Sequence, residues 1–137
     1  MKRLILLMSG LAALAGCGTA PLSFIDGRPE GALHFHEYPV RVVSVDGSLN
    51  FRNPVQLEAG VHTLVLQAAN GKSAYRNWQQ TVSFDVAPCT RYHVLALREN
   101  DFRKDWQLVV KATDNVGGCD PSLELKKSAL AAGQTPS

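Results

Sequence analysis

Residues 78–86 read Trp-Gln-Gln-Thr-Val-Ser-Phe-Asp-Val, and this stretch decides the fold. Side chains alternate between the two faces of a β-strand, so every second residue of the stretch lies on the same side. One face collects the apolar residues, with Gln80 as its polar exception, and the other face is polar throughout. The alternation predicts a strand with one buried face, because a helix would need apolar residues at every third or fourth position.

Short segments of the same kind flank this stretch on both sides. Turn signals such as Asp46-Gly47 and Asn70-Gly71 separate them. We therefore expect an all-β domain over residues 32–120, folded as a small antiparallel β-sandwich of about six to eight short strands with one disulfide. The further strand candidates are 41–45, 54–57, 61–67, 92–97 and 106–110.

The chain begins like a secretory signal. Lys2 and Arg3 provide a basic start, residues 4–14 form a short apolar run, and small residues follow before Cys17. This order predicts a signal peptide over residues 1–16 that is cut before Cys17. The run is shorter than the about 20 apolar residues that a membrane span needs, and no later stretch is long enough. The alternative is an ordinary secretory signal with a chance cysteine.

The segment Leu14-Ala15-Gly16-Cys17 resembles the bacterial lipobox. The resemblance implies that the Cys17 thiol receives a diacylglyceryl lipid, that the signal is removed, and that the new amino group is acylated. Two or more acyl chains hold a protein stably on a membrane. In Gram-negative members an Asp after the cysteine favours the inner membrane, so Gly18 implies the periplasmic face of the outer membrane.

The charge balance excludes nucleic acid as a partner. The chain has 14 Lys and Arg against 12 Asp and Glu, and loss of Lys2 and Arg3 with the signal leaves 12 of each. A mature chain without formal net charge has no strong field to gather a polyanion. No basic run is long enough to form a nucleic-acid patch either.

Three cysteines are present, and Cys17 is assigned to lipid. Exported chains commonly form disulfides, so we expect Cys89 and Cys119 to pair. The rival hypothesis is a two-thiol metal site, but neither cysteine has the CxxC or CxH spacing of such sites. We expect no cofactor.

Two further segments flank the predicted domain. Residues 17–31 are rich in Gly and Pro and show no periodicity, so we expect a flexible tether between lipid and domain. Residues 121–137 are expected to form a partly disordered tail, with one or two helical turns over 123–130.

The strand pattern resembles a known module. Residues 43–47 read Val-Ser-Val-Asp-Gly, and the turn and core positions that follow have the spacing of the PEGA-type domain: Pro54, Leu57, Gly60, His62, Leu64 and Leu66. The resemblance covers roughly residues 40–97 and implies a transthyretin-like β-sandwich, used outside the cytoplasm as a binding or spacer module. The cysteine pair and the strand around Trp106 depart from the basic pattern, which suggests a separate lipoprotein family on a similar fold.

His34 and His36 are the candidate metal ligands. Residues two apart face the same way on a strand, Glu37 lies next to them, and imidazole suits both Zn²⁺ and Cu²⁺. Such a site would need one or two more ligands, for which His93 is a candidate. The alternative is a solvent-facing pair at the entrance of the domain.

The other histidines have structural explanations. His62 follows the turn Glu58-Ala59-Gly60, where we expect it to hydrogen-bond near the turn. His93 lies within an apolar strand and is expected to face outward or to be half-buried. No GxSxG motif or glycine-rich phosphate loop occurs, so we expect no catalytic residues and no enzyme activity.

Aromatic residues beside arginine offer the best binding surface. Tyr75, Arg76 and Trp78 form one such cluster, and side chains of these types are enriched at interface hot spots. The alternative for Trp78 is burial in the core, and the same alternative holds for Trp106, because both occupy strand positions.

These features predict a membrane-anchored envelope lipoprotein that acts as a non-enzymatic binding or structural module and contacts another envelope protein or the cell wall. A second hypothesis is a periplasmic lysozyme-type inhibitor, since residues 71–75 have a short likeness to the loop that such inhibitors insert into the enzyme. A third is a periplasmic metal-binding protein that uses His34 and His36.

Overall fold

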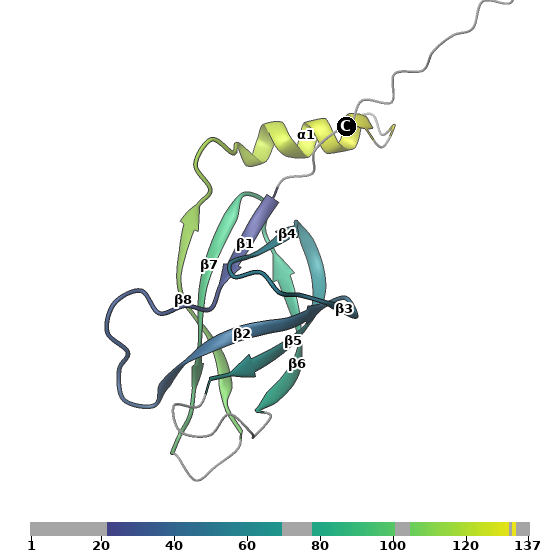
Figure 1. Cartoon of the computed structure of the whole chain (residues 1–137). Helices are drawn as coiled ribbons and strands as arrows, with labels where there is room; N and C mark the ends of the chain where they lie inside the picture. Colours follow the sequence, from purple (N-terminus) through teal and green to yellow (C-terminus); the bar gives the residue numbers. More distant parts are fainter. Residues whose placement is uncertain (1–21, 70–77, 101–104, 132, 134–137) are drawn as a thin grey trace, which may run out of the picture.

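The computed structural model describes residues 22–69, 78–100, 105–131 and 133. Figure 1 shows a fold dominated by β-strands, with helix α1 at one end. This confirms the predicted all-β class. The described part of the chain contains no helix that is long and apolar enough to cross a membrane. The elements follow in the order β1 (Leu22–Asp26), β2 (Glu37–Val45), β3 (Ser48–Leu49), β4 (Val55–Glu58), β5 (Gly60–Ala68), β6 (Gln79–Val86), β7 (Thr90–Leu97), β8 (Gln107–Asn115) and α1 (Pro121–Ala131).

Strand β2 joins the two parts of the sheet. Its residues 37–39 pair with β7, and its residues 40–45 pair with β5. A register shift between Val42 and Ser44 bends the strand as it crosses, as β-bulges do. The hydrogen-bonded path runs β4-β1-β7-β2-β5-β6, with β3 beside β2 and β8 beside β7. The result is a sandwich-like fold with the core inside.

The sheet is mixed rather than purely antiparallel. β1 runs antiparallel to β4 but parallel to β7, with Phe24 opposite Arg91 and Asp26 opposite His93. Parallel neighbours need a long connection, and here the strands β2 to β6 lie between the two partners in sequence. Local sequence patterns indicate strands but not their partners, so the predicted antiparallel arrangement is wrong for this pair.

Residues 22–26 belong to the domain, which corrects the expected tether over 17–31. In β1 the buried residues are Ser23, Ile25 and Asp26. The strand ends at Gly27, where a Cβ atom would lie 1.8 Å from the carbonyl oxygen of Val40, so only glycine fits this close approach. Gly27 and Pro29 follow directly after this strand. Residues of these types therefore mark where β1 ends and do not show that the segment lacks a strand.

Ser23 ties β1 to the turn between β6 and β7. Its hydroxyl donates to the Ala87 carbonyl oxygen at 2.6 Å and accepts from the Thr90 amide at 3.0 Å. The side chain is fully buried, so water has no access to replace these bonds if the hydroxyl is lost.

The core contains both tryptophans. Trp78 and Trp106 are 9% and 6% exposed, and the indole Nε1 of Trp106 donates to the Trp78 carbonyl oxygen at 3.0 Å. The guanidinium of Arg98 lies 3.8 Å from the centre of the Trp78 ring. Trp78 is therefore a core residue, which corresponds to the alternative given for its predicted role in partner contact. The buried apolar cluster consists of Ile25, Val40, Val42, Val55, Leu57, Leu64, Leu66, Ala68, Trp78, Val86, Tyr92, Val94, Ala96 and Trp106.

The disulfide between Cys89 and Cys119 forms as predicted. It joins the turn between β6 and β7 to the segment that precedes α1. The Val116 amide donates to the Cys89 carbonyl oxygen at 2.8 Å, which holds the same two segments together through the backbone.

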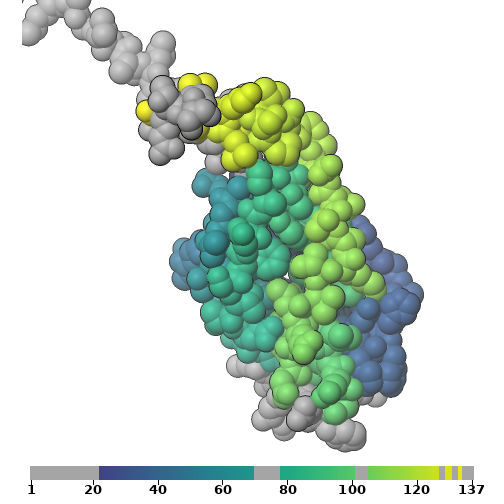
Figure 2. All heavy atoms as spheres, turned by 180° about the vertical axis from the view of Figure 1, so that it is seen from behind, coloured from purple at the N-terminus to yellow at the C-terminus, as the bar shows by residue number. Residues whose placement is uncertain are grey.

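Helix α1 is longer than the one or two turns expected for the tail. Oδ1 of Asp120 accepts from the amides of Ser122 and Leu123 at 2.9 and 3.3 Å and from the Ser122 hydroxyl at 2.7 Å, so Asp120 caps the helix. These bonds, the hydroxyl bond above all, lower the pKa of Asp120. α1 lies at the end of the domain where β1 begins (Figure 1), and Figure 2 shows it beyond the end of β8.

We expect Ser23→Ala to lower the free energy of unfolding by about 1–3 kcal/mol, because it leaves the Ala87 carbonyl and the Thr90 amide without a partner. Urea unfolding followed by tryptophan fluorescence measures the loss. Ser48→Ala, at an exposed position of β3, is the matched control and should stay within about 0.5 kcal/mol of the wild type. Equal stability of the two variants would contradict the place of β1 inside the sheet.

Replacement of both Cys89 and Cys119 by serine should destabilise the fold by about 3–4 kcal/mol through loop-closure entropy, since the bridge joins residues 30 apart. Urea unfolding with and without reductant measures the effect. Reductant should bring the wild type to the midpoint of the double variant and leave the variant unchanged. A wild-type midpoint that does not respond to reductant would count against the bridge.

Candidate functional site

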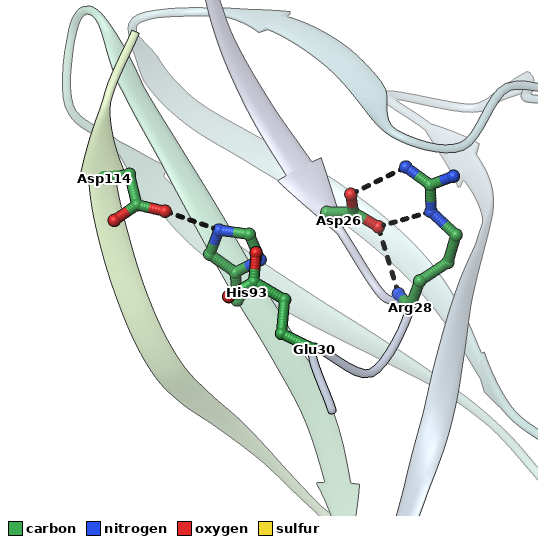
Figure 3. A network of polar contacts seen from close by, with 5 residues as sticks. All are labelled: Asp26, Arg28, Glu30, His93 and Asp114. Carbon is green, nitrogen blue, oxygen red and sulfur yellow. Dashed lines mark hydrogen bonds and ion pairs between the residues drawn. The ribbon is translucent and has the colours of Figure 1, made fainter. Parts of the chain in front are cut away.

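Among the described residues, Glu30, His93 and Asp114 form a polar cluster that could hold a metal ion (Figure 3). Their ligand atoms lie within 4.8 Å of one another. His93 is on β7, Asp114 is on β8, and Glu30 is in the segment that follows β1. Three separate parts of the sequence therefore meet at this point.

The position of β7 in the sheet explains why a histidine is buried here. β1 and β2 pair along one edge of β7, and β8 pairs along the other. Residues 92–96 are all buried, so both faces of this strand are covered. His93 lies opposite Ala112 on β8. Asp114, two residues further along β8, faces the same side of the sheet and reaches the ring.

The two nitrogens of the His93 ring have different surroundings. Nε2 lies 2.8 Å from Oδ2 of Asp114, at hydrogen-bond distance. Nδ1 lies 3.4 Å from Oε1 of Glu30, and this buried nitrogen makes no hydrogen bond in the described structure. The His93 side chain is 7% exposed, against 67% for Glu30 and 61% for Asp114. Because a carboxylate only accepts, Nε2 carries a proton, and in the neutral ring the lone pair is then on Nδ1.

Two basic residues near the cluster already have partners. Arg28 donates to Oδ1 and Oδ2 of Asp26 at 3.0 and 2.9 Å, which lowers the pKa of Asp26 and raises the pKa of Arg28. The ammonium of Lys111 donates to both carboxylate oxygens of Glu37 at 3.0 and 2.7 Å and lowers the pKa of Glu37. Both cations are thus held by carboxylates outside the cluster.

A pocket of about 220 Å³ opens beside His93. Sites for drug-sized molecules usually start at about 300 Å³, so this pocket suits an ion with its waters or a small group. Among the described residues that line it, none is Ser, Thr or Cys. The lining residues are Arg28, Pro29, Glu30, Ala32, Leu33, His93, Val94, Leu95, Lys111 and Ala112.

His34 and His36 do not lie on a strand, which corrects their predicted arrangement. They belong to a turn in which the Glu37 amide donates to the His34 carbonyl oxygen at 3.1 Å, and His36 has a positive φ of 69°. The rule that residues two apart in a strand face the same way therefore does not apply to His34 and His36. Neither residue belongs to the metal-capable cluster found in the described part of the chain.

Sequence reasoning identifies one member of the cluster and is wrong about its burial. His93 is expected to face outward or to be half-buried, whereas it is buried. Glu30 falls in the expected tether, and Asp114 lies beyond the predicted strand 106–110, which in the structure extends from Gln107 to Asn115. The apolar run on both sides of His93 is the sequence feature that indicates its burial. A strand that is buried on both faces has apolar residues in succession and no alternation.

His62 hydrogen-bonds at the turn, as predicted. Its Nδ1 lies 2.7 Å from Oδ2 of Asp46, and its Nε2 lies 2.9 Å from the Glu58 carbonyl oxygen. Both partners are acceptors, so the doubly protonated ring satisfies both contacts. The hydrogen bond with Asp46 raises the pKa of His62, and the same bond lowers the pKa of Asp46.

The remaining predicted site residues, Cys17, Tyr75 and Arg76, lie outside the described residues, as does the segment 71–75. Comparisons with protein-family models, with curated proteins and with solved structures give no match for this chain. The resemblances to the lipobox and to the PEGA-type domain stay predictions.

The pair of His62 and Asp46 makes stability depend on pH in two directions. A histidine with a raised pKa stabilises the fold below its unfolded value of 6.5, and this contribution is lost as the pH rises through the folded pKa. An aspartate with a lowered pKa stabilises the fold above its unfolded value of 3.8, and this contribution is lost as the pH falls through the folded pKa.

We therefore expect wild type and His62→Gln to differ more in urea midpoint at about pH 5.5 than at about pH 8.5. Urea titrations of both proteins across this range measure the difference. His34→Gln, which alters an exposed histidine, should show no such trend. A gap between wild type and His62→Gln that is constant with pH would refute the charged pair.

Proposed function

We propose that this chain is a lipid-anchored lipoprotein of the cell envelope and that its β-domain is a non-enzymatic binding module held close to the membrane. The observation that carries the proposal is the start of β1 at Leu22, five residues after Cys17. Five residues span at most about 18 Å. A lipid on Cys17 would thus hold the sheet itself, and not a distant domain on a long tether, at the bilayer surface.

The disulfide supports export. Disulfides form and persist in oxidising compartments such as the periplasm and the cell surface. Cys89 and Cys119 bond to each other, so Cys17 is the cysteine that lipid attachment would use. Residues 1–16 support the same route, because their basic start and apolar run have the order of a secretory signal.

The geometry supports one orientation on the membrane. β1 begins at the end of the domain that carries α1 (Figure 1). The end of β7 at Leu97 and the start of β8 at Gln107 lie at the opposite end. With Cys17 in the bilayer, this opposite end points away from the membrane.

A second pocket supports a binding role for the far end. It has a volume of about 560 Å³, and its lining includes Phe35, Leu97, Arg98 and Trp106. This volume lies in the range of about 300–1,000 Å³ that is usual for binding sites. Phe35 is 84% exposed, and aromatic side chains are enriched in interfaces. The partner class that we propose is another envelope protein or the cell wall.

Cys17→Ser should abolish the incorporation of labelled palmitate when the chain is produced in a Gram-negative host, because serine lacks the thiol that forms the thioether. We expect the variant to leave the membrane fraction or to stay unprocessed. The double variant of Cys89 and Cys119 to serine is the matched control and should keep its label. Labelled Cys17→Ser protein, or wild type without label, would refute the proposed anchor.

A further inference from the structure

We propose that Nδ1 of His93 and the carboxylate of Glu30 bind a first-row divalent metal ion, Zn²⁺ being the best fit, and that Asp114 orients the ring. This inference concerns the folded domain alone and does not rest on lipid attachment. It replaces the predicted pair of His34 and His36 by a site that the sheet itself assembles.

The state of the His93 ring is the first argument. The hydrogen bond from Nε2 to Asp114 fixes the tautomer that leaves the lone pair on Nδ1. Histidines that bind metals commonly donate their other ring N–H to a carboxylate in this way. Nδ1 is buried and makes no hydrogen bond to any described residue, a state that is unfavourable for a polar atom. A metal ion at Nδ1 would satisfy it.

The separation of the two ligand atoms is the second argument. Nδ1 of His93 and Oε1 of Glu30 are 3.4 Å apart. This is long for a hydrogen bond. Two ligands that each lie about 2.1 Å from a tetrahedral Zn²⁺ are themselves about 3.4 Å apart. The two side chains therefore already have the spacing that a shared tetrahedral ion requires.

The local charge is the third argument. Glu30 and Asp114 are carboxylates, whereas Arg28 and Lys111, which line the same pocket, are hydrogen-bonded to Asp26 and Glu37. Arg91 lies opposite Asp114 in the ladder. Its guanidinium lies 5.4 Å from the centre of the Phe24 ring. The carboxylates of Glu30 and Asp114 thus favour a cation over an anion beside His93.

Water in the pocket would complete the coordination shell of the ion. Its volume of about 220 Å³ leaves room for water at the ion. An imidazole with one carboxylate suits Zn²⁺ and its neighbours in the first row, whereas Ca²⁺ takes 6–8 oxygen ligands. With two ligands from the protein, water would hold the remaining positions on the ion. A small donor from solution could replace that water.

The test is the titration of the full-length chain, purified in mild detergent without a polyhistidine tag, with Zn²⁺ against a colorimetric chelator. We expect one ion per chain. Asp114→Asn should weaken binding by about 10- to 100-fold, and Glu30→Gln by at least as much. Both residues are exposed, so these variants should fold. His34→Gln is the matched control and should bind as the wild type does.

Co²⁺ gives a second readout that separates ligands from the positioning residue. The visible absorption of tetrahedral Co²⁺ should appear with the wild type, disappear with Glu30→Gln, and return with Asp114→Asn at higher metal concentration. Wild-type affinity in both variants would overturn the proposal, and so would binding that follows His34 or no binding at micromolar Zn²⁺.

Discussion

Strand β1 lies between β4 and β7, and the hydroxyl of Ser23 bonds to the backbone at both ends of the turn that leads into β7. Ser23 and Ile25 are buried, so loss of this strand would open the sheet and expose the core. Gly27 then lets the chain pass against the Val40 carbonyl, because a side chain would collide there. The path of the next segment is thereby fixed as well.

The same strand relates the proposed anchor to the proposed metal site. Its first residue is close in sequence to Cys17, and its last residue, Asp26, lies beside His93 in the parallel ladder. Asp26 holds Arg28 through two side-chain hydrogen bonds, and Glu30 follows with its carboxylate against the His93 ring. A short strand thus leads from the proposed anchor to the cluster, where Asp26 and the segment after it lie beside His93 (Figure 3).

The fold could be predicted where one face of a strand is core and the other is solvent. In β6, Val86 is buried and Asp85 is exposed, so the alternation of residues 78–86 is visible in the sequence. β7 is covered on both faces, so alternation disappears and His93 cannot be assigned a face from its neighbours. β1 is too short to show a pattern. The candidate site joins three segments through the order of strands, which local sequence does not encode.

Amide hydrogen exchange of the full-length chain, followed by mass spectrometry of peptides that cover residues 22–26, tests the place of β1 most directly. Amides hydrogen-bonded inside a sheet exchange only when the structure opens. We expect β1 to be protected to the same extent as β5, since both pair on two edges. Exchange of β1 at the rate of an unstructured peptide, with β5 still protected, would contradict it.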